Sequence, residues 1–576
     1  MRKKTLAFIM KYVLKKGFLF VLSVILAIFA VVSTLLFPII TGKTVDTVVS
    51  AGNVDFETLK NILIIGLIVV GVTVLSQFLL SLVNNRMTAG VVYDIRKDVM
   101  NKIQKLPVSY IDGRKAGDLV TVMTADVETL SDGLLMGFTQ VFTGVMTIIL
   151  SLGIMIALNW KIAIVVICVT PLSFFVAGFI SKRTYNLFTK QNKARAEQVS
   201  FVNEMVGNQK AVRAFGMEEE NLEKFDSLND TFKSAALKAT FYSSLTNPST
   251  RFVNSVVYAG VAVFGAISIV HKGSLTIGTL TSFLFYANQY TKPFNEISGV
   301  ITEFQNALSS AERIKAFLDE RELFDKEDAV GSISDDFGMI SFKNISFSYK
   351  PEQKLIENFS VDVKKGTRVA IVGPTGCGKT TLINLLMRFY SVKDGEIRID
   401  GVPVNDIVRR AYREKFGMVL QDTWLKNASV RENITFGRDF NDEEIEEACR
   451  KCHAHSFIER LPQGYDTIIS EDGGNLSNGQ KQLLCIARVM LLNPPILILD
   501  EATSSIDTRT ELKVQDAFDK LMKGKTSFIV AHRLSTIRNA DIILVMNNGN
   551  IVEQGTHEEL LSKHGFYYNL YMSQWN

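Results

Sequence analysis

The first half of the chain carries six long, nearly uncharged apolar stretches, and these limit the fold more than any other feature. An α-helix needs about 20 apolar residues to cross the hydrocarbon core of a bilayer, because each residue rises only about 1.5 Å. Each stretch reaches roughly this length, and the sixth is the least apolar. They are Gly17–Ile40, Ile62–Val83, Gly133–Leu158, Ile162–Ile180, Phe252–Val270 and Thr276–Pro293. The sequence therefore predicts a helical membrane domain with six spans.

Lysine and arginine are unevenly distributed among the segments that join these stretches. They are frequent before the first stretch, between the second and third, and between the fourth and fifth. The other connections hold few of them: Lys43, Lys60, Lys161 and Lys272. Because basic loops stay on the cytoplasmic side, this alternation places both chain ends in the cytoplasm. The first stretch is longer than the apolar core of a signal peptide, so we expect a retained span.

The two long basic connections are predicted to be helical. Segments such as "VVYDIRKDVMNKIQKL" and "EQVSFVNEMVGNQKAVRAF" carry apolar residues at helical spacing and lack the Gly, Pro and Ser bias of flexible linkers. We expect the membrane helices to continue into the cytoplasm as rods, each pair joined by a short transverse helix. The alternative interpretation is amphipathic helices lying on anionic lipid.

The middle of each span is free of Asp and Glu, which argues against an ion or proton path. The sixth span instead combines aromatic and amide side chains. These either line a cavity for an amphipathic organic molecule or serve ordinary helix packing and an interfacial aromatic belt. The residues concerned are Phe283, Phe285, Tyr286, Asn288, Gln289 and Tyr290.

The second half of the chain contains a phosphate-binding loop. Residues 367–382 read "TRVAIVGPTGCGKTTL", an apolar strand, a glycine-rich turn and a helix start. The glycines allow a tight turn whose N–H groups face phosphate oxygens. Lys379 supplies positive charge to the β- and γ-phosphates, and the Thr380 hydroxyl ligates Mg²⁺. The predicted site comprises Gly373, Pro374, Thr375, Gly376, Cys377, Gly378, Lys379, Thr380 and Thr381.

An acidic pair follows a second apolar strand in "PPILILDEATSSID". A continuous apolar run such as Ile496–Leu499 is typical of a parallel strand buried on both faces. Such a strand delivers Asp500 to its carboxyl end, where ligands of doubly wound sheets bind. We expect Asp500 to hold Mg²⁺ and Glu501 to polarise the attacking water. Helix capping by the acidic pair is the alternative interpretation.

Between these segments stands "LSNGQKQLLCIARVMLLNP", which resembles the signature motif of ABC transporter ATPases. The resemblance implies that two such ATPase domains face each other head to tail. Ser477, Gly479 and Gln480 would then complete the nucleotide site of the partner subunit.

Further pieces occur in the order typical of this family. Tyr349 in "FSY" resembles the aromatic residue that stacks on adenine, and Asp507 in "SSID" the loop that contacts the opposite subunit. Gln421 in "GMVLQD" resembles the glutamine that joins the nucleotide site to the membrane domain, and we expect it to act in catalysis and on Mg²⁺. His532 in "IVAHRLST" resembles the catalytic histidine that touches the γ-phosphate.

The membrane half resembles the same family. "LPVSYIDGRKAGDLVTVMTADVETL" and "EMVGNQKAVRAFGMEEENLEKF" are similar to its two intracellular loops. Six spans followed by one ATPase resemble an ABC exporter half-transporter. The expected fold is an α-helical transmembrane domain (1–315), a linker (316–338) and an α/β P-loop ATPase domain with a helical subdomain (339–576).

The segment "CRKCHAH" at 449–455 has the spacing of a haem-attachment or zinc motif. Helical spacing does not bring Cys449, Cys452, His453 and His455 onto one face, and the segment falls in the expected helical subdomain. We therefore interpret it as a structural part of that subdomain. Five cysteines in the whole chain also do not make a disulfide framework.

The resemblance implies ATP-driven export of a hydrophobic or amphipathic small molecule, a drug or a lipid, by alternating access. ATP and Mg²⁺ are the implied cofactors, and the expected location is a bacterial cytoplasmic membrane. An importer or lipid flippase of the same fold and an ATP-gated channel are the alternatives. The net charge of +4 gives no reason to expect nucleic-acid binding.

The signature departs from the family pattern at Asn478, where glycine is usual, and "ISEDGG" precedes it. Together with "SSIDTRTE", these features resemble the catalytically complete half of bacterial heterodimeric exporters. We expect a second ABC half-transporter as partner, a heterodimer rather than the alternative homodimer.

Overall fold

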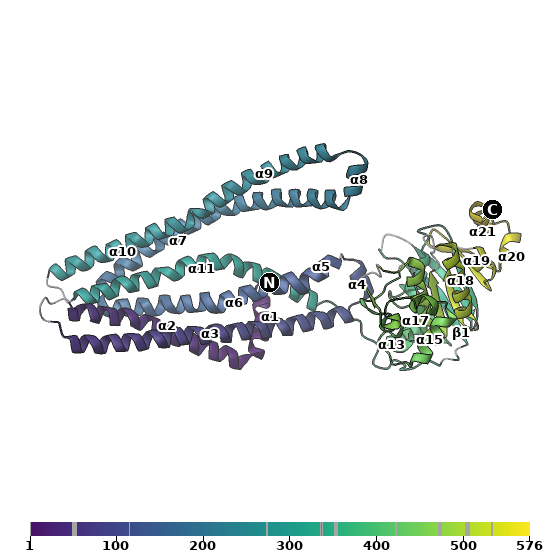
Figure 1. The fold of residues 1–576 in the computed structure, drawn as a ribbon, viewed down its shortest axis with the longest axis horizontal. Helices are drawn as coiled ribbons and strands as arrows, with labels where there is room; N and C mark the ends of the chain where they lie inside the picture. Colours follow the sequence, from purple (N-terminus) through teal and green to yellow (C-terminus); the bar gives the residue numbers. More distant parts are fainter. Residues whose placement is uncertain are drawn as a thin grey trace. The chain divides into compact units, whose positions relative to one another are not determined.

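The computed structural model describes residues 2–48, 54–114, 116–271, 275–334, 336, 338–350, 355–420, 423–470, 475–500, 507–531 and 534–575. The chain forms two compact units (Figure 1). The first contains Met1–Lys105 and Arg114–Arg321, and the second contains Leu106–Gly113 and Glu322–Asn576. The domain limits given above stay a prediction. The observed division also assigns Leu106–Gly113 to the second unit, which the sequence did not indicate.

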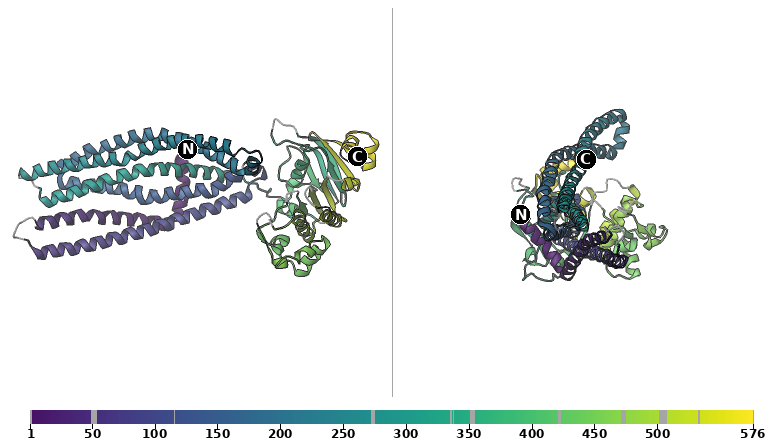
Figure 2. Two further views of the ribbon diagram at one scale, coloured as in Figure 1. Left: turned by 45° about the horizontal axis from the view of Figure 1, so that its top comes forward. Right: turned by 90° about the vertical axis from the view of Figure 1, so that its left-hand side faces the viewer.

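The first unit consists of long helices that lie side by side (Figures 1 and 2). The helices are α1 (Arg2–Lys15), α2 (Gly17–Val48), α3 (Phe56–Lys105), α5 (Ala116–Thr121), η1 (Val122–Asp126), α6 (Val127–Met136), η2 (Gly137–Val141), α7 (Phe142–Gly207), α8 (Gln209–Ala214), α9 (Glu218–Ser244), α10 (Thr246–Val270) and α11 (Ile277–Leu318). The helical class predicted for this half is confirmed.

Four described segments are long and apolar enough to cross a bilayer. They are Gly17–Val48, Phe56–Lys105, Gly117–Cys168 and Arg251–Val270. These segments contain the first, second, third and fifth predicted spans. The fourth and sixth predicted spans lie within α7 and α11 but do not meet the criterion among the described residues. The number of six spans therefore stays a prediction.

The helical rods predicted for the basic connections are confirmed. α3 has 50 residues, about 75 Å of helix, and continues far beyond Val83, where its predicted span ends. α4 (Val108–Asp112) and α8 are the short helices that follow the rods. Within α7 the backbone is non-helical at Asn159 (φ −160°, ψ 105°), between the predicted third and fourth spans. The Asn159 side chain accepts hydrogen bonds from the N–H groups of Lys161 and Ile162 (3.1 and 3.2 Å), so it caps the helix that follows.

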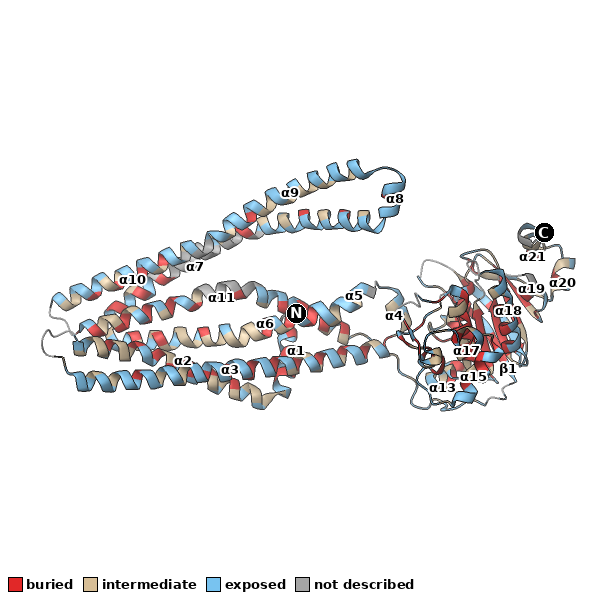
Figure 3. Cartoon of the chain, viewed as in Figure 1, coloured by how far each residue is buried: buried red, intermediate tan, exposed pale blue. Residues whose placement is uncertain are grey.

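The first unit exposes large apolar side chains along its helices. Figure 3 shows long exposed faces on α2, α3 and α10. Phe18, Leu67 and Val270, for example, are 80%, 77% and 78% exposed. A surface of this extent is unfavourable in water, whereas lipid tails are as apolar as these side chains. The exposed faces therefore fit a helix bundle that is solvated by a bilayer.

The aromatic residues of the sixth predicted span divide between two faces of α11. Phe283, Tyr286 and Tyr290 are buried in the helix bundle, and the Tyr286 hydroxyl donates to the Leu35 carbonyl at 2.5 Å. Phe285 is 42% exposed. For the buried three the geometry favours the packing interpretation over the cavity interpretation.

The second unit is built around a six-stranded sheet with the order β12-β11-β3-β10-β9-β6. Its central strands are parallel, and β12 is antiparallel to β11. A four-stranded sheet, β2-β1-β4-β5, packs on one side, and helices cover the remaining faces (Figure 2). The strands are β1 (Met339–Phe347), β2 (Ile356–Lys364), β3 (Arg368–Val372), β4 (Asp394–Ile399), β5 (Val402–Pro403), β6 (Phe416–Val419), β7 (Ala428–Ser429), β8 (Ile468–Ile469), β9 (Ile496–Asp500), β10 (Thr526–Val530), β11 (Ile542–Asn547) and β12 (Asn550–Gly555).

Helices fill the connections of the second unit, and those between β6 and β9 form the predicted helical subdomain. The helices are α12 (Lys379–Leu386), η3 (Val404–Asp406), α13 (Arg409–Arg413), α14 (Val430–Thr435), α15 (Asp442–Lys451), α16 (His455–Ile458), η4 (Gly464–Asp466), α17 (Asn478–Leu492), α18 (Thr508–Met522), α19 (Leu534–Arg538), α20 (His557–Ser562) and α21 (Phe566–Trp575). The α/β fold with a helical subdomain is confirmed.

The side chains of the "CRKCHAH" segment point to different partners. Cys449 and Cys452 are fully buried in the core, and burial raises the pKa of their thiols to about 11 and about 12. The His453 ring contacts Asp516 (2.5 Å), whereas the His455 ring contacts the Tyr465 hydroxyl (2.9 Å). The four residues therefore serve the packing of the subdomain.

Part of the predicted linker is docked on the second unit. Val330 N donates to the Asp406 carbonyl (2.7 Å), and Val408 N donates to the Val330 carbonyl (3.0 Å). The Asp325 carboxylate accepts from the backbone N–H of Arg409 (3.1 Å) and from its guanidinium (2.7 Å). The linker segment from Asp325 to Val330 therefore forms a strap along this unit.

Candidate active site

The phosphate loop connects β3 to α12, and its glycines are required by its geometry. A Cβ atom at Gly373 would clash with the Met546 carbonyl and lie 2.7 Å from the Cys377 sulfur. Gly376 and Gly378 have φ values of +81° and +101°, a region that side-chain-bearing residues rarely adopt. The loop also receives a hydrogen bond on the Cys377 carbonyl from Gly549 N (3.0 Å). These contacts fix the turn and leave Thr375, Gly376 and Thr380 exposed.

Lys379, the first residue of α12, is buried with 9% of its surface exposed. Its ammonium donates to the carbonyls of Gly373 (2.8 Å) and Pro374 (3.1 Å). No carboxylate of the described residues pairs with it, so its charge is balanced only by neutral dipoles. A buried cation without a counter-ion favours an anion, and the N-terminus of α12 adds positive potential. The loop therefore fits the phosphates of a nucleotide.

Cys377 is buried within the loop at 4% exposure. Burial raises the pKa of its thiol, and the nearby Lys379 charge opposes this shift only in part. The thiol is therefore protonated at neutral pH, and it is the thiolate that reacts with oxidants and alkylating agents. This geometry favours the interpretation of Cys377 as a small residue that the loop tolerates.

Asp500 ends β9 at the same edge of the sheet. β10 pairs in parallel with both β3 and β9, and Val530 is the partner of Ile371 on one side and of Asp500 on the other. The carboxyl ends of these strands therefore lie together, with Asp500 near the loop that follows β3. The Thr380 hydroxyl and the Asp500 carboxylate are the hard oxygen ligands that Mg²⁺ prefers. These residues fit the metal.

The three predicted catalytic residues, Gln421, Glu501 and His532, lie outside the described residues. β6, β9 and β10 precede them in the chain, and all three strands end at the edge described above. Their predicted roles stay predictions.

Tyr349 follows β1 and is 47% exposed. Its ring meets the rings of Phe347 and Tyr390 edge to face, with centroids 5.0 Å away in each case. Asn384 of α12 donates to the Tyr349 hydroxyl (3.3 Å), which connects the ring to the helix of the phosphate loop. The ring is thus held by two edge-to-face contacts while about half of its surface is exposed, which fits stacking with an adenine.

Tyr390 and Asp112 are two residues at this site that sequence reasoning missed. The Tyr390 hydroxyl donates to the Asp112 carboxylate of α4 at 2.7 Å. Burial and this hydrogen bond raise the pKa of the Tyr390 hydroxyl, so it remains a donor at physiological pH. The aromatic ring that supports Tyr349 therefore also holds α4. Only the similarity of "LPVSYIDG" to an intracellular loop pointed to this region.

The signature segment begins α17. The Ser477 hydroxyl accepts from Gln480 N (3.3 Å), and the Gln480 side chain accepts from Ser477 N (2.9 Å), which makes a capping box. Gly479 is buried, whereas Ser477 and Asn478 are exposed. Ser477 and Gln480 thus bond to each other and not to the phosphate loop of the same chain. The exposed start of a 15-residue helix is suited to an anion that a second molecule supplies.

The chain was compared with known proteins. Residues 20–294 match the family model of the ABC transporter transmembrane region, and residues 356–504 match that of the ABC transporter. A fatty acid ABC transporter ATP-binding/permease protein of Mycobacterium tuberculosis is 38% identical over 91% of this chain and 83% of its own. A putative multidrug export ATP-binding/permease protein of Staphylococcus aureus is 38% identical over 84% of each chain. A solved bacterial Atm1-family ABC exporter with ATP bound has a TM-score of 0.80 and 27% identity, covering 98% of this chain and 99% of its own.

The chain belongs to the ABC transporter family, as an exporter-type half-transporter that fuses one transmembrane region to one ATPase domain. It is a multi-pass membrane protein whose ATPase domain is cytoplasmic, and its ATP hydrolysis is coupled to transport. ATP is the nucleotide and Mg²⁺ the metal of this site.

Proposed function

We propose that this chain exports a hydrophobic or amphipathic small molecule, a lipid or a drug, as one half of an ATP-driven dimer. The main observation behind the proposal is the Lys379 ammonium, which is buried at the sheet edge without a carboxylate partner among the described residues. The same chain has helices that are long and apolar enough to cross a bilayer. The relatives named for fatty acid and for multidrug export support this substrate class.

In the proposed mechanism each residue has a defined task. Lys379 and the loop N–H groups bind the β- and γ-phosphates, Tyr349 orients the adenine, and Thr380 with Asp500 holds Mg²⁺, which neutralises phosphate charge when bound. Glu501 polarises the attacking water. Gln421 and His532 position the water and the γ-phosphate. The strand order supports this assignment for all of these residues except Tyr349, because β3, β6, β9 and β10 end at one sheet edge. Tyr349 follows β1 of the four-stranded sheet.

The partner would supply the rest of the site. Ser477, Gly479 and Gln480 of one subunit contact the γ-phosphate held by the loop of the other, so ATP binding stabilises the closed dimer and hydrolysis releases it. The exposed start of α17 supports this arrangement, since its polar groups have no phosphate in their own chain. α4 and Gln421 would transmit the closure to the membrane helices.

A second observation supports a partner chain. The hairpin formed by the ends of α7 and α9 and by α8 follows the apolar spans, yet it exposes apolar side chains. Val206, Phe215 and Leu237 are 69%, 79% and 64% exposed. A protein partner that covers this hairpin would remove these apolar side chains from water. We infer that this hairpin lies against the second subunit.

The second subunit is proposed to be a different ABC half-transporter, with a homodimer as the alternative. The departure at Asn478 and the "ISEDGG" segment favour pairing of one complete and one degenerate site. Expression of this chain alone decides between the two. Brisk ATPase activity in a homogeneous dimer of identical chains would rule out the heterodimer, whereas activity that appears only with a co-expressed second chain supports it.

Transport itself is tested with inside-out membrane vesicles that contain the chain and its partner. On addition of ATP, a fluorescent amphipathic probe should accumulate in the vesicles, and the Lys379→Ala variant should abolish accumulation. ATP-dependent loss of the probe would indicate an importer. Passive equilibration that needs ATP binding but no hydrolysis would indicate a channel, and lipid reorientation without probe transport a flippase.

A further inference from the structure

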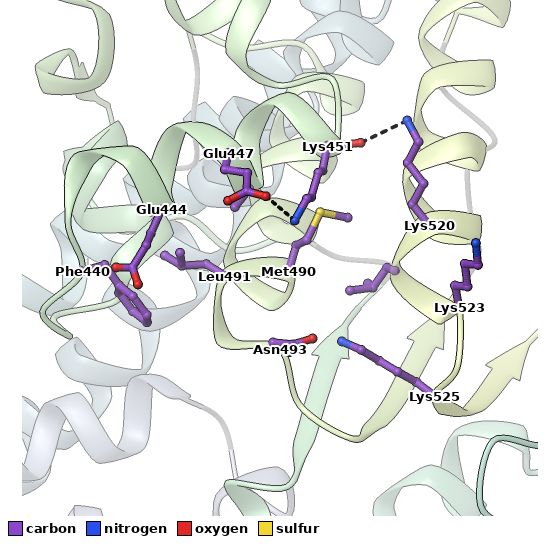
Figure 4. A pocket seen from close by; sticks show the side chains of 12 residues that line it. Phe440, Glu444, Glu447, Lys451, Met490, Leu491, Asn493, Lys520, Lys523 and Lys525 are labelled. Carbon is purple, nitrogen blue, oxygen red and sulfur yellow. Dashed lines mark hydrogen bonds and ion pairs between the residues drawn. The ribbon is translucent and has the colours of Figure 1, made fainter.

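The second unit contains a cavity of about 590 Å³ lined by lysines between α15, α17 and α18 (Figure 4). Lys451 pairs with Glu447 (2.7 Å), and Lys520 pairs with Asp516 (2.5 Å). The charge of these two lysines is therefore balanced within the protein. Such pairing near helix C-termini is a usual structural arrangement. Lys523 and Lys525 also line this cavity and form no ion pair among the described residues.

The second cavity, of about 630 Å³, lies where the linker, α13 and the helical subdomain meet. Arg409, Arg410 and Arg413 project from α13, and Arg438 comes from the segment that follows α14. Phe416 and Leu492 contribute apolar wall. The guanidinium groups thus face one space from two sides, and none of these residues belongs to the phosphate loop or to the signature segment.

The positive charge around this cavity is poorly balanced. Asp325 serves both Arg409 (2.7 Å) and Arg388 (3.9 Å). Arg413 donates only to carbonyls, those of Met387 (3.3 Å) and Arg388 (3.0 Å). The Arg438 side chain has no hydrogen-bond or ion-pair partner among the described residues. Among the described residues that line the cavity, the exposed Arg410 alone has a carboxylate that it does not share, Glu414, at 3.0 Å.

Two further features show that the carboxylates at this site balance the guanidinium groups only in part. The Nε atom of Arg409 is buried and has no hydrogen-bond partner in the described part of the chain. Burial lowers the pKa of Arg388 and of Arg413, and the charge of Arg409 lowers both further. Like charges are therefore held close together in a partly dry site. Asp325 offsets this repulsion only in part, and a multivalent anion would satisfy the free donor and relieve the remaining repulsion.

We propose that this cavity binds a soluble, compact phosphate oligomer of the pyrophosphate class. Guanidinium groups match phosphate oxygens with paired N–H donors, and several at one site favour an anion of more than one charge. Arg409, Arg413 and Arg438 are the binding residues. Because Asp325 already occupies Arg409, the anion competes with the linker for this side chain. Binding at this site and release of the linker strap are therefore coupled.

The test is calorimetric titration of inorganic pyrophosphate into the full-length chain in lipid nanodiscs, in a Lys379→Ala background that weakens the phosphate loop. Arg438→Ala should reduce affinity roughly tenfold, since it removes charge-assisted hydrogen bonds while replacing an exposed side chain. Asp325→Asn should instead increase affinity, because it removes the competing carboxylate. Arg450→Ala, which removes an exposed arginine paired with Glu446 outside the cavity, is the matched control and should have no effect.

Opposite responses to Arg438→Ala and Asp325→Asn are specific to this cavity. Equal affinity in the background, Arg438→Ala and Asp325→Asn proteins would place the anion elsewhere and overturn the proposal. Failure of the Lys379→Ala chain to bind pyrophosphate at low ionic strength would overturn it as well. Thermal unfolding of each variant checks that the fold is kept. The result is independent of the proposed transport function, because no step of the titration requires ATP turnover.

Discussion

At the scale of single residues, the nucleotide site depends on one buried charge and one missing side chain. Lys379 is a buried ammonium that touches neutral carbonyls. Gly373 leaves no room for even a methyl group beside the Met546 carbonyl. Both residues are fixed by the loop before a ligand arrives.

Substitution of Glu501 should separate binding from turnover. Glu501→Gln keeps the side chain's size but removes the carboxylate that polarises water, so ATP binding should persist and hydrolysis should fall by about a hundredfold or more. Radiolabelled ATP retention and phosphate release measure the two. Turnover near the wild-type rate would show that another group is the general base.

Lys379→Ala should give the complementary result. Loss of a charge-assisted contact to the phosphates should weaken ATP binding by roughly tenfold or more. Filter binding of ATP to the purified chain measures this change. If affinity is unchanged, the buried ammonium does not face the phosphates.

Gly373→Ala should also abolish nucleotide binding, but through the backbone. The added methyl group forces the loop away from β11, and overpacking of this kind typically costs about 1–3 kcal/mol. Gly331→Ala is the matched control, since its Cβ would meet no atom within 4 Å. Normal ATP affinity of Gly373→Ala would mean that the loop rearranges freely.

At the residue scale, a short motif predicted the local backbone geometry of the site, whereas the binding roles of its residues stay predictions. The loop glycines, Lys379 and Asp500 lie where the strand and turn pattern indicated. Tyr390 and Asp112 were not predicted, because their hydrogen bond joins residues 278 positions apart. Gln421, Glu501 and His532 fall outside the described residues, so their roles rest on resemblance and strand order.

At the scale of elements, the Tyr390 hydroxyl connects α4 to the aromatic residues of the nucleotide site. Tyr390→Phe keeps the ring against Tyr349 but removes the hydrogen bond to Asp112. We expect ATP affinity to change little, while stimulation of the ATPase by transported substrate declines. Parallel measurements of ATP binding and substrate-stimulated hydrolysis test this expectation.

Tyr390→Ala is the companion variant, since it also removes the ring contact and should weaken ATP binding. If Tyr390→Phe and Tyr390→Ala behave alike in both measurements, the hydroxyl plays no separate part in coupling.

Element types were predictable because apolar periodicity and glycine-rich turns are local signals. α1, an amphipathic helix before the first span, was not predicted, since its pattern lacks a long apolar run. The docking of the linker was also missed. It depends on Asp325 meeting Arg409, a contact that no local pattern specifies.

At the scale of the whole molecule, the exposed hairpin of α7, α8 and α9 calls for a second chain. Val206→Asp should weaken association with the partner, because a charge at a buried interface is costly. Gln209→Asp adds the same charge at an exposed polar position of the hairpin and is the matched control. Light scattering of the purified complex measures association. Equal dimer fractions for both variants would exclude Val206 from the interface.

The order of the two domains, membrane helices followed by an ATPase, could be predicted from the sequence, because apolar spans and the phosphate-loop motif are strong signals. The number of spans and the identity of the partner are not settled by these signals. Span six, for example, contains Asn288 and Gln289, which lower its hydropathy, and the departure at Asn478 bears on the kind of partner but not on its sequence.

The cluster of Tyr349, Tyr390 and Asp112 has a consequence for which triphosphates can support transport. Inorganic triphosphate, which has no base, would bind Lys379 without contacting Tyr349, which packs on Tyr390 next to α4. Such a compound should be hydrolysed without transport, because it does not contact the rings. A purine nucleotide, by contrast, would contact the Tyr349 ring, which packs on the Tyr390 ring that holds α4. The base of the nucleotide, and not only its phosphates, would then determine whether hydrolysis is coupled to transport.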